Sequence, residues 1–404
     1  MKILHVTAQK PDSTGSGVYL AQTVAALKRQ GHEQAVICGV DTQDVPALPQ
    51  GVALYDVRFN TEELPFNACG MSDEMPYPST RYRDMTPQML AQFKTAFLAR
   101  LNKALDEFQP QVIVCNHLYL LTALVRENAG GVPVVGICHN TCLRQLEQHD
   151  MGNAWIKERI AELDLVLALH EDQRKRVLEM FDLSEERVRI IGSGYNAQVF
   201  NMGDRVIDEH PEHIGRDLLY VGKMTYKKGI SSLLSAVSQL KCPPKTVTLR
   251  LCGGVSNSFQ QTALDLLIQE NPQNIEYLGR VDDKTLAEQY RKTHIFTLAS
   301  FYEGLPLCVI EALACGCKVV VTDLPGLRPW IEENIPNAPV WYVQPPRMQD
   351  VDEPLKRDLP EFEERFARVI EEAAAAKPNI VSVLHLSWDG LAKRLAGYCE
   401  ELLS

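Results

Sequence analysis

Short apolar runs rich in β-branched residues alternate with longer helix-like segments along almost the whole chain. This alternation constrains the fold most, because it is typical of parallel strands joined by crossover helices. In the first half we predict strands at Lys2–Thr7, Gln34–Cys38, Val52–Arg58, Val112–Cys115, Val132–Cys138, Leu165–Leu169 and Val188–Ile191. In the second half we predict strands at Asp217–Val221, Val247–Cys252, Ile275–Leu278, His294–Leu298, Cys317–Val321 and Val340–Val343. The expected fold class is α/β, with two doubly wound parallel sheets.

Helices are predicted between these strands, and several carry residues that mark helix ends. Thr86 and Pro87 are typical of a cap and a first helical residue, whereas Gly31 and Gly316 are typical of C-caps. The helices predicted in this way include Val18–Arg29, Pro87–Phe108, Ile230–Leu240, Gln260–Glu270, Thr285–Arg291 and Leu307–Cys315, the last with Pro306 at its first position.

The length of 404 residues exceeds one ordinary core and suggests two or three domains. Residues 201–216 are polar and charged and lack either periodicity, so we expect a linker there. It separates an N-terminal domain over 1–200 from a C-terminal domain over 217–385, and residues 386–404 form a closing helix.

Charge and composition exclude several classes of protein. The formal net charge of −11 offers no bulk attraction for nucleic acid or for an anionic membrane surface. No apolar run approaches the roughly 20 residues of a membrane helix, and Met1–Thr7 is too short for a signal sequence. The eleven cysteines form no CxxC pair, which indicates reduced, buried thiols. We expect a cytoplasmic protein without a membrane span.

A glycine-containing loop, AQKPDSTGSG, follows the first predicted strand and leads into a helix. Gly15 and Gly17 allow a ligand to approach the backbone closely, and the start of the helix favours an anion. The loop matches neither a Walker A motif nor a GxGxxG fingerprint. A plain turn therefore stays an equal alternative.

A second loop, VGKMTYKKG, leaves the first strand of the C-terminal half. Lys223 and Lys228 lie five residues apart at this strand end, so both ammonium groups can point into one crevice. The alternative is a solvated surface turn.

The stretch EGLPLCVIE carries two acids, one in a turn and one inside an apolar helix. Glu311 is surrounded in sequence by small and apolar residues, and burial of its charge costs several kcal/mol unless donors pair with it. Sugar hydroxyls are suitable donors. The alternative is a structural carboxylate that backbone groups or a lysine satisfy.

These three stretches, in this order, resemble the retaining, nucleotide-sugar-dependent glycosyltransferases of family 4. The resemblance also covers ALKRQGHE, GSGYNAQVF, IEYLGRV and LSWDGLAKRL, and so extends over nearly all of the chain. It implies the GT-B fold, in which two Rossmann-like domains face a cleft. It also implies that the C-terminal helix packs back on the N-terminal domain.

By this resemblance, the C-terminal domain holds the donor between acids and cations. Glu311 would bind the ribose hydroxyls and Glu303 the transferred sugar. Lys223 and Lys228 would neutralise the diphosphate. The family's usual residue at the first cation position is arginine, and lysine keeps the charge but loses the bidentate fork.

Backbone groups would complete the donor site. Amides near Leu307, with Gly15 and Gly17 reaching across the cleft, would bind the diphosphate, and the backbone near Arg280 would meet the base. Pro306 replaces the glycine of many relatives and removes one amide donor.

The acceptor is expected on the N-terminal domain. ICHNTCLRQ follows a strand and is similar to the family's His-x-Thr-Asp pattern, with Cys142 in place of the acid. The resemblance puts His139 near the reacting sugar, beside Thr141 and Arg144. Asn116-His117 is a second polar pair at a strand end, and we rank it lower.

Residues 59–84 form an irregular insertion rich in aromatic residues and methionine. Arg81 and Arg83 either clamp an anionic acceptor or decorate a surface loop, and we favour the loop. The resemblance leaves several acceptors open, including malate, inositol phosphate and an envelope glycan or lipid-linked acceptor with peripheral membrane contact.

The implied reaction transfers a hexosyl or N-acetylhexosaminyl group, with His139, Glu303, Lys223 and Lys228 as the catalytic set. Cations and helix-end amides stabilise the leaving diphosphate, so neither a metal nor another cofactor is expected. We interpret the DxD spacing that begins at Asp350 as incidental. UDP-sugars are favoured as donors, with GDP-sugars as the other choice.

Three other functions are alternatives to this transferase. A sugar-nucleotide epimerase lacks this arrangement of two glutamates, and a phosphorylase needs a pyridoxal-phosphate lysine that we do not find. A binding protein without catalysis is the third, although both glutamates, both lysines and His139 are present together.

Overall fold

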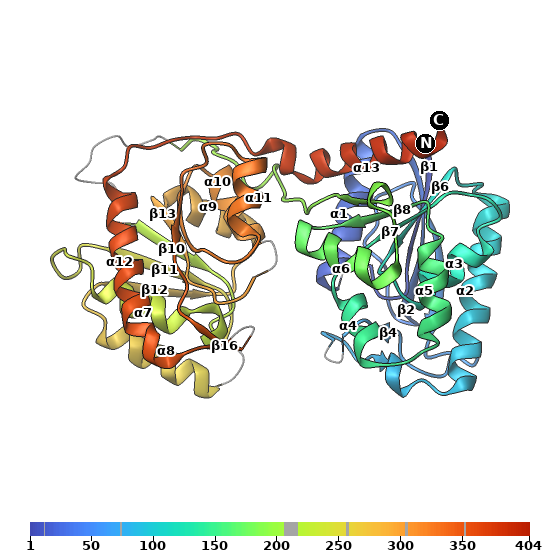
Figure 1. Ribbon diagram of the computed structural model, residues 1–404, viewed down its shortest axis with the longest axis horizontal. Coiled ribbons are helices and arrows are strands. Elements are labelled where there is room, and N and C mark those ends of the chain that lie inside the picture. Colours follow the sequence, from blue (N-terminus) through green and yellow to red (C-terminus); the bar gives the residue numbers. More distant parts are fainter. Residues whose placement is uncertain (12, 73–74, 206–216, 256–257, 304–305, 351–352) are drawn as a thin grey trace. The chain divides into compact units, whose positions relative to one another are not determined.

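The structure is a computed structural model that describes residues 1–11, 13–72, 75–205, 217–255, 258–303, 306–350 and 353–404, without the side chains of 258–260. The chain forms two compact units. Unit 1 contains Met1–Gly194 and Trp388–Ser404, and unit 2 contains Tyr195–Ser387. Each unit has one large parallel sheet with helices around it, which confirms the two Rossmann-like α/β domains (Figure 1).

Unit 1 contains a seven-stranded sheet in the order β3-β2-β1-β6-β7-β8-β9. Its strands are β1 (Lys2–Thr7), β2 (Glu33–Asp41), β3 (Ala53–Phe59), β6 (Val112–Asn116), β7 (Val134–Ile137), β8 (Leu165–Ala168) and β9 (Val188–Ile190). The strand order reverses between β1 and β6, which pair from Ile3↔Val112 to Val6↔Cys115. In doubly wound sheets, ligands bind beyond the carboxyl ends of the strands at such a reversal.

The helices of unit 1 begin where the sequence supplies capping groups. Thr14 accepts a hydrogen bond from the Gly17 amide, and Thr86 accepts one from the Met89 amide ahead of Pro87. The helices are α1 (Gly15–Arg29), α2 (Pro87–Glu107), α3 (Leu120–Asn128), α4 (Thr141–Gln148), α5 (Asn153–Ala161), α6 (Glu171–Phe181) and α13 (Trp388–Leu403). Two short helices are η1 (Tyr82–Asp84) and η2 (Glu185–Arg187).

Unit 2 contains a six-stranded sheet in the order β12-β11-β10-β13-β14-β15. Its strands are β10 (Asp217–Val221), β11 (Thr248–Cys252), β12 (Asn274–Gly279), β13 (Ile295–Leu298), β14 (Lys318–Thr322) and β15 (Val340–Val343). The order reverses between β10 and β13. The helices are α7 (Ile230–Ser238), α8 (Ser258–Glu270), α9 (Asp283–Lys292), α10 (Leu307–Ala314), α11 (Leu327–Asn334) and α12 (Leu359–Ala375). The short elements are η3 (Tyr226–Lys228), β16 (Met348–Asp350), β17 (Glu353–Pro354), η4 (Lys356–Asp358) and η5 (Leu384–Leu386).

Every strand predicted from the alternation is present, with its ends shifted by a few residues at most. The predicted helix starts are less accurate, because α1, α8 and α9 begin two or three residues before the predicted Val18, Gln260 and Thr285. The first helix begins at Gly15 rather than Val18, because the Thr14 side chain caps it one turn earlier. Pro306 is the N-cap of α10 rather than its first residue, and Gly316 follows the helix with a φ of +82°.

The division between the units lies between Gly194 and Tyr195, a few residues before the predicted boundary. The reason is that α9 holds the segment that follows. The Arg291 guanidinium donates to the carbonyls of Val199 (2.7 Å) and Asn201 (2.9 Å). Most of the predicted linker, residues 206–216, lies outside the described residues.

Helix α13 returns to unit 1, as predicted. Leu391 and Leu395 are fully buried in a cluster that also contains Ile3 and Val112 of the sheet. The helix packs beside α1, where Arg29 forms an ion pair with Asp389 (2.8 Å).

The insertion over 59–84 contributes to the core of unit 1. Leu64, Ala68, Cys69 and Tyr82 are each at most 1% exposed and join the cluster beneath α2. This segment adds β4 (Cys69–Gly70) and β5 (Thr80–Arg81) as a two-stranded parallel pair.

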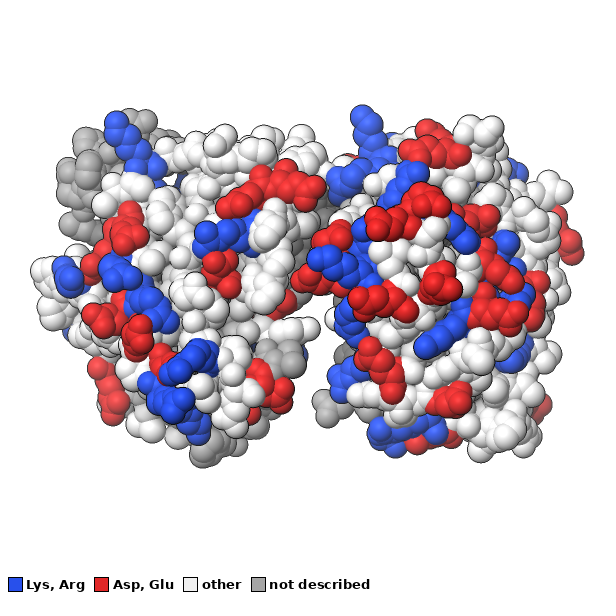
Figure 2. All heavy atoms as spheres, in the orientation of Figure 1, with Lys and Arg blue, Asp and Glu red and all other residues white. Residues whose placement is uncertain are grey.

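The surfaces of both units carry mixed charge. On the face drawn in Figure 2, lysine and arginine side chains are interspersed with aspartate and glutamate. All eleven cysteines are free thiols, and all but Cys242 and Cys308 are buried. Among the described residues, no helix combines the length and the apolar character needed to cross a bilayer.

Candidate functional site

The loop after β10 places the two predicted lysines at the reversal point of unit 2. Gly229 has a φ of +67°, and a Cβ built on it would lie 1.9 Å from the Ala299 carbonyl oxygen. A glycine is therefore needed where this loop meets the end of β13. Lys223 is exposed, and among the described residues it forms no ion pair, whereas Lys228 is only partly exposed.

Glu303 meets Lys228 directly. The Lys228 ammonium lies 2.8 Å from Glu303 Oε2, and the Ser300 hydroxyl donates to Glu303 Oε1 over 2.8 Å. Ser300 is fully buried, so its hydroxyl holds this carboxylate oxygen from the protein interior. The two predicted donor contacts, one acidic and one basic, form an ion pair in this structure.

Glu311 lies half-buried on the second turn of α10. The Tyr290 hydroxyl donates to its Oε2 over 3.2 Å. Burial raises the pKa of Glu311 to about 7; the tyrosine hydrogen bond opposes the rise, and the charge of Asp283 adds to it. A buried acid was expected to need hydrogen-bond donors, and the Tyr290 hydroxyl is one such donor to Glu311.

The remaining predicted donor residues of unit 2 lie on neighbouring loops. Arg280 directly follows β12, and its guanidinium passes so close to Gly254 that a Cβ there would lie 2.6 Å from Nε. Leu307 is the first residue of α10, after the Pro306 cap. The turn residues 304–305, which the donor prediction also uses, lie outside the described residues.

The ends of β10, β11 and β12 are joined by backbone hydrogen bonds. The amide of Gly222 donates to Cys252 O (3.0 Å), and that of Gly253 donates to Gly279 O (2.7 Å). Gly253 has a φ of +143°, and a Cβ on it would lie 1.8 Å from the Gly222 carbonyl oxygen. These contacts join the lysine loop and the Arg280 loop at the carboxyl ends of the three strands.

In unit 1, polar side chains gather beyond the ends of β1, β6 and β7. Gln9, which is 1% exposed, places its amide nitrogen 3.2 Å from Thr14 Oγ1 and 3.1 Å from His117 Nε2. His117 Nε2 also lies 2.9 Å from Ser16 Oγ, on the first turn of α1. The cluster therefore links the glycine loop to the end of β6.

His139 contacts Asn116 and His117, the second polar pair predicted at a strand end. Its Nε2 lies 2.8 Å from Asn116 Oδ1, and its ring packs against those of Tyr19 (5.0 Å) and His117 (4.9 Å). Burial, with the nearby His117, holds the pKa of His139 well below its usual range. The neutral ring can donate from Nε2 to Asn116 and accept at Nδ1.

The two glycines at the start of α1 lie in different settings. The Gly17 amide donates to Thr14 Oγ1 (3.0 Å), so that amide is already occupied. Gly15 is exposed at the first position of α1, and no atom lies within 4 Å of a Cβ placed on it. Gly15 is the better placed of the two for close approach of a ligand.

The three predicted acceptor residues lie in different settings. The Thr141 amide donates to the His139 carbonyl (2.8 Å), so the two residues are adjacent. Arg144 is exposed on α4. Arg81 is exposed and forms a local ion pair with Asp84 (2.6 Å), which supports the surface-loop interpretation over the clamp.

Sequence reasoning missed Gln9, Ser16, Tyr290 and Ser300. Gln9 and Ser300 each lie just past a strand end, a position that could have drawn notice. Tyr290 gave no such signal, because its contact depends on how α9 packs against α10.

No clear metal site emerges from the described part of the chain, where no three His, Cys, Asp or Glu side chains are grouped to hold an ion. Asp350 ends β16, and the second aspartate of the DxD spacing lies outside the described residues. Independence from metal stays a prediction.

Two family models match this chain. Residues 13–199 match the family model described as Glycosyltransferase Family 4, and residues 215–351 match the one described as Glycosyl transferases group 1. A D-inositol 3-phosphate glycosyltransferase from Frankia alni is 27% identical over 385 residues, covering 88% of this chain and 89% of that protein.

Solved structures share the fold. A sucrose-phosphate synthase from Thermosynechococcus elongatus superimposes with a TM-score of 0.61 at 20% identity, covering 100% of this chain and 99% of that one. The Anabaena protein HepE in complex with UDP and glucose gives a TM-score of 0.59 at 15% identity, covering 99% of this chain and 100% of that one. The two family matches, the relative along most of its length and the paired parallel sheets agree, and the chain belongs to the family 4 glycosyltransferases, enzymes of the GT-B fold.

Proposed function

We propose that this glycosyltransferase moves a hexosyl or N-acetylhexosaminyl group from a nucleotide-sugar to a hydroxyl acceptor, with retention of configuration and without a metal ion. The observation that carries the proposal is the pair of acids at α10. Glu303 lies before the helix in contact with Lys228, and Glu311 lies half-buried within it. UDP-sugars are the favoured donors, supported by the UDP in the HepE complex of the same fold, with GDP-sugars second.

The charges of unit 2 suit a departing nucleoside diphosphate. Breaking the bond from the sugar to the β-phosphate builds negative charge on that phosphate, which Lys223, Lys228 and the start of α10 would stabilise. Electrostatic stabilisation of this kind supplies several kcal/mol without a metal.

The ion pair between Lys228 and Glu303 gives each charge a partner that a bound donor would replace. A diphosphate competes for the Lys228 ammonium, and Glu303 Oε2 is then released to accept a hydrogen bond from a sugar hydroxyl. Ser300 keeps Oε1 in place throughout. Donor binding would thus exchange one ion pair for two contacts with the ligand.

We propose that unit 1 binds the acceptor through Asn116, His139 and Thr141. In the front-face reaction, the acceptor oxygen forms its bond to the anomeric carbon on the side from which the diphosphate leaves. The departing phosphate takes the acceptor proton, so no protein nucleophile takes part. A neutral His139 with Nδ1 as acceptor suits hydroxyl binding.

The test is a panel of UDP-, GDP- and ADP-sugars with mixed hydroxyl acceptors, in which release of nucleoside diphosphate is measured with and without a chelator. We expect turnover that the chelator leaves unchanged, and NMR of the product to show the donor's anomeric configuration. The Glu303→Gln variant serves as the inactive control. Binding without turnover for every donor, or loss of activity with the chelator, would contradict the proposal.

A further inference from the structure

The Tyr290 side chain connects two helices of unit 2 through a single hydroxyl. Its residue is fully buried on α9, and its ring packs against Phe200 (5.9 Å) and Phe296 (5.8 Å). The hydroxyl lies 3.2 Å from Glu311 Oε2 and 3.3 Å from the Cys308 carbonyl oxygen. Both acceptors belong to α10, so one proton bridges α9 to the helix that carries the donor-binding acid.

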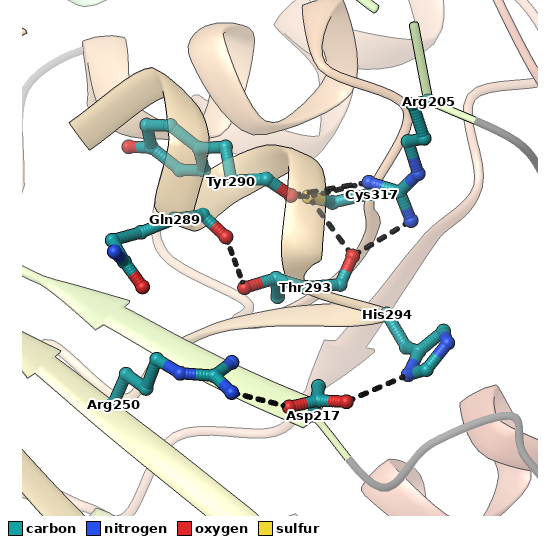
Figure 3. A network of polar contacts seen from close by, with 8 residues as sticks. All are labelled: Arg205, Asp217, Arg250, Gln289, Tyr290, Thr293, His294 and Cys317. Atoms are coloured by element: carbon teal, nitrogen blue, oxygen red, sulfur yellow. Dashed lines mark hydrogen bonds and ion pairs between the residues drawn. The ribbon is translucent and has the colours of Figure 1, made fainter. Parts of the chain in front are cut away.

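The backbone of Tyr290 is fixed independently of this hydroxyl. Its carbonyl accepts hydrogen bonds from Arg205 Nη1 (3.1 Å) and from Cys317 Sγ (3.1 Å), and Arg205 also donates to Thr293 O (2.7 Å). Figure 3 shows the tyrosine ring on the other side of the main chain from this network. Loss of the hydroxyl alone therefore leaves the packing and the backbone contacts of Tyr290 in place.

The groups around Glu311 are acidic or neutral. Asp283 on α9 is negative, and Cys308 on α10 and Cys315 directly after that helix are thiols whose pKa values burial raises. Arg291 of α9 directs its guanidinium to Val199 and Asn201 instead. Within the described residues, no cation pairs with Glu311, and Tyr290 is the one side chain that donates to its carboxylate.

We propose that Tyr290 is a positioning residue of the donor site, whose hydroxyl favours the ionised form of Glu311 and directs its carboxylate to accept hydrogen bonds from the ribose hydroxyls of the donor. The proposal rests on the role proposed for Glu311. A protonated carboxyl loses acceptor capacity, so donor binding depends on the ionised form. Tyr290 acts only through that form and does not touch the donor.

The sign of the pH dependence follows from the burial of Glu311. Because the pKa of Glu311 is raised to about 7, donor affinity falls as pH drops through that value and reaches its maximum above it. Tyr290→Phe removes the one contact that lowers this pKa, so the midpoint moves upward by about one to two pH units. The donor affinity of the variant at pH 7 is then about five- to fifty-fold below that of the wild type, and the two affinities converge at high pH.

The experiment measures binding of UDP-glucose, GDP-mannose and ADP-glucose by calorimetry from about pH 5.5 to about pH 9.5. Sugar nucleotides are chosen because their substituted diphosphate releases no proton near pH 7, unlike a free nucleoside diphosphate. Thermal unfolding and circular dichroism check that each variant is folded. The matched control is Tyr398→Phe, whose hydroxyl donates to Ile190 O (3.3 Å) in unit 1 and should leave the profile unchanged.

A double-mutant comparison isolates the contact. Glu311→Gln should weaken binding and flatten the profile between pH 6 and 8, and Tyr290→Phe added to it should shift nothing further. An unmoved midpoint in Tyr290→Phe, with a flat profile in Glu311→Gln, would overturn the positioning role and leave the donor site intact. An unchanged profile in Glu311→Gln would overturn the ribose role itself. If none of the three probes binds the wild-type protein, the donor function fails and this inference fails with it.

Discussion

The two acids proposed to bind the donor each have partners within unit 2. Glu303 takes a lysine and a serine, and Glu311 takes a tyrosine. The sequence predicted that Glu311 needs donors but not which ones, because Tyr290 is 21 positions away in the chain. A carboxylate paired with a lysine, which is the structural alternative for Glu311, is found at Glu303 instead. Lys223 is exposed directly after β10.

Lys223→Arg tests whether the missing guanidinium fork matters. Arginine contacts phosphate with two parallel donors, so binding of UDP-glucose should stay unchanged or tighten by up to about tenfold. Calorimetric titration at low and high salt measures this, with Lys245→Arg on a surface turn as the control. A large loss of affinity would show that the site is built for the shape of the lysine.

Asn116→Asp tests the contact that holds His139. A carboxylate beside Nε2 favours the imidazolium, so the pKa of His139, now well below its usual range, should rise. The folded wild type disfavours the charged ring of His139, so the free energy of unfolding falls as pH drops below the ordinary histidine pKa. The variant should lose less of this free energy over the same pH range. NMR titration of the ring signals checks this against Asn128→Asp. An unmoved His139 signal would contradict the contact.

At the scale of elements, the sequence predicted strands better than helix starts. Apolar runs bounded by polar loops identify buried parallel strands, and all of these were found. Helix starts depend on single capping contacts, such as Thr14 to the Gly17 amide, which periodicity does not register. The close contacts between loops could not be predicted from the sequence either, since the approach of Gly229 to Ala299 depends on how two strands pair.

Gly229→Ala tests the joint between the lysine loop and β13. Gly229 and Gly279 share a φ of +67°, but a Cβ has no atom within 4 Å at Gly279 and lies 1.9 Å from the Ala299 carbonyl oxygen at Gly229. Gly279→Ala should cost about 1–2 kcal/mol for the backbone conformation alone. Gly229→Ala should cost about 1–3 kcal/mol more through overlap. Urea unfolding compares the two, and equal losses would contradict the close approach.

At the scale of the whole molecule, the chain order and the spatial units differ. Unit 1 is made from both ends of the described chain, because α13 supplies one of its walls. The resemblance to family 4 predicted this return, whereas the amphipathic pattern of the last helix alone predicts only that it packs somewhere. The boundary at Tyr195 was harder to predict, because it is set by the contacts of Arg291 with the backbone.

Leu395→Ala tests the contribution of α13 to unit 1. Leu395 is fully buried, so truncation should cost about 2–5 kcal/mol of the free energy of unfolding of unit 1. Leu403→Ala on the same helix is the control, since Leu403 is 41% exposed and should cost under about 0.5 kcal/mol. Hydrogen exchange should show the loss in unit 1 while unit 2 keeps its protection. Equal effects of both variants would contradict the packing of α13.

The return of α13 also orders events on the ribosome. Unit 2 is synthesised in full before residue 388 appears, and at about 5–20 residues per second this takes about 10–40 s. During that interval the nascent N-terminal sheet has its strands but lacks the helix that covers Ile3, Val112 and Val135. The second domain to emerge is therefore the first that can finish folding, and the apolar face of the first stays without its covering helix for that interval.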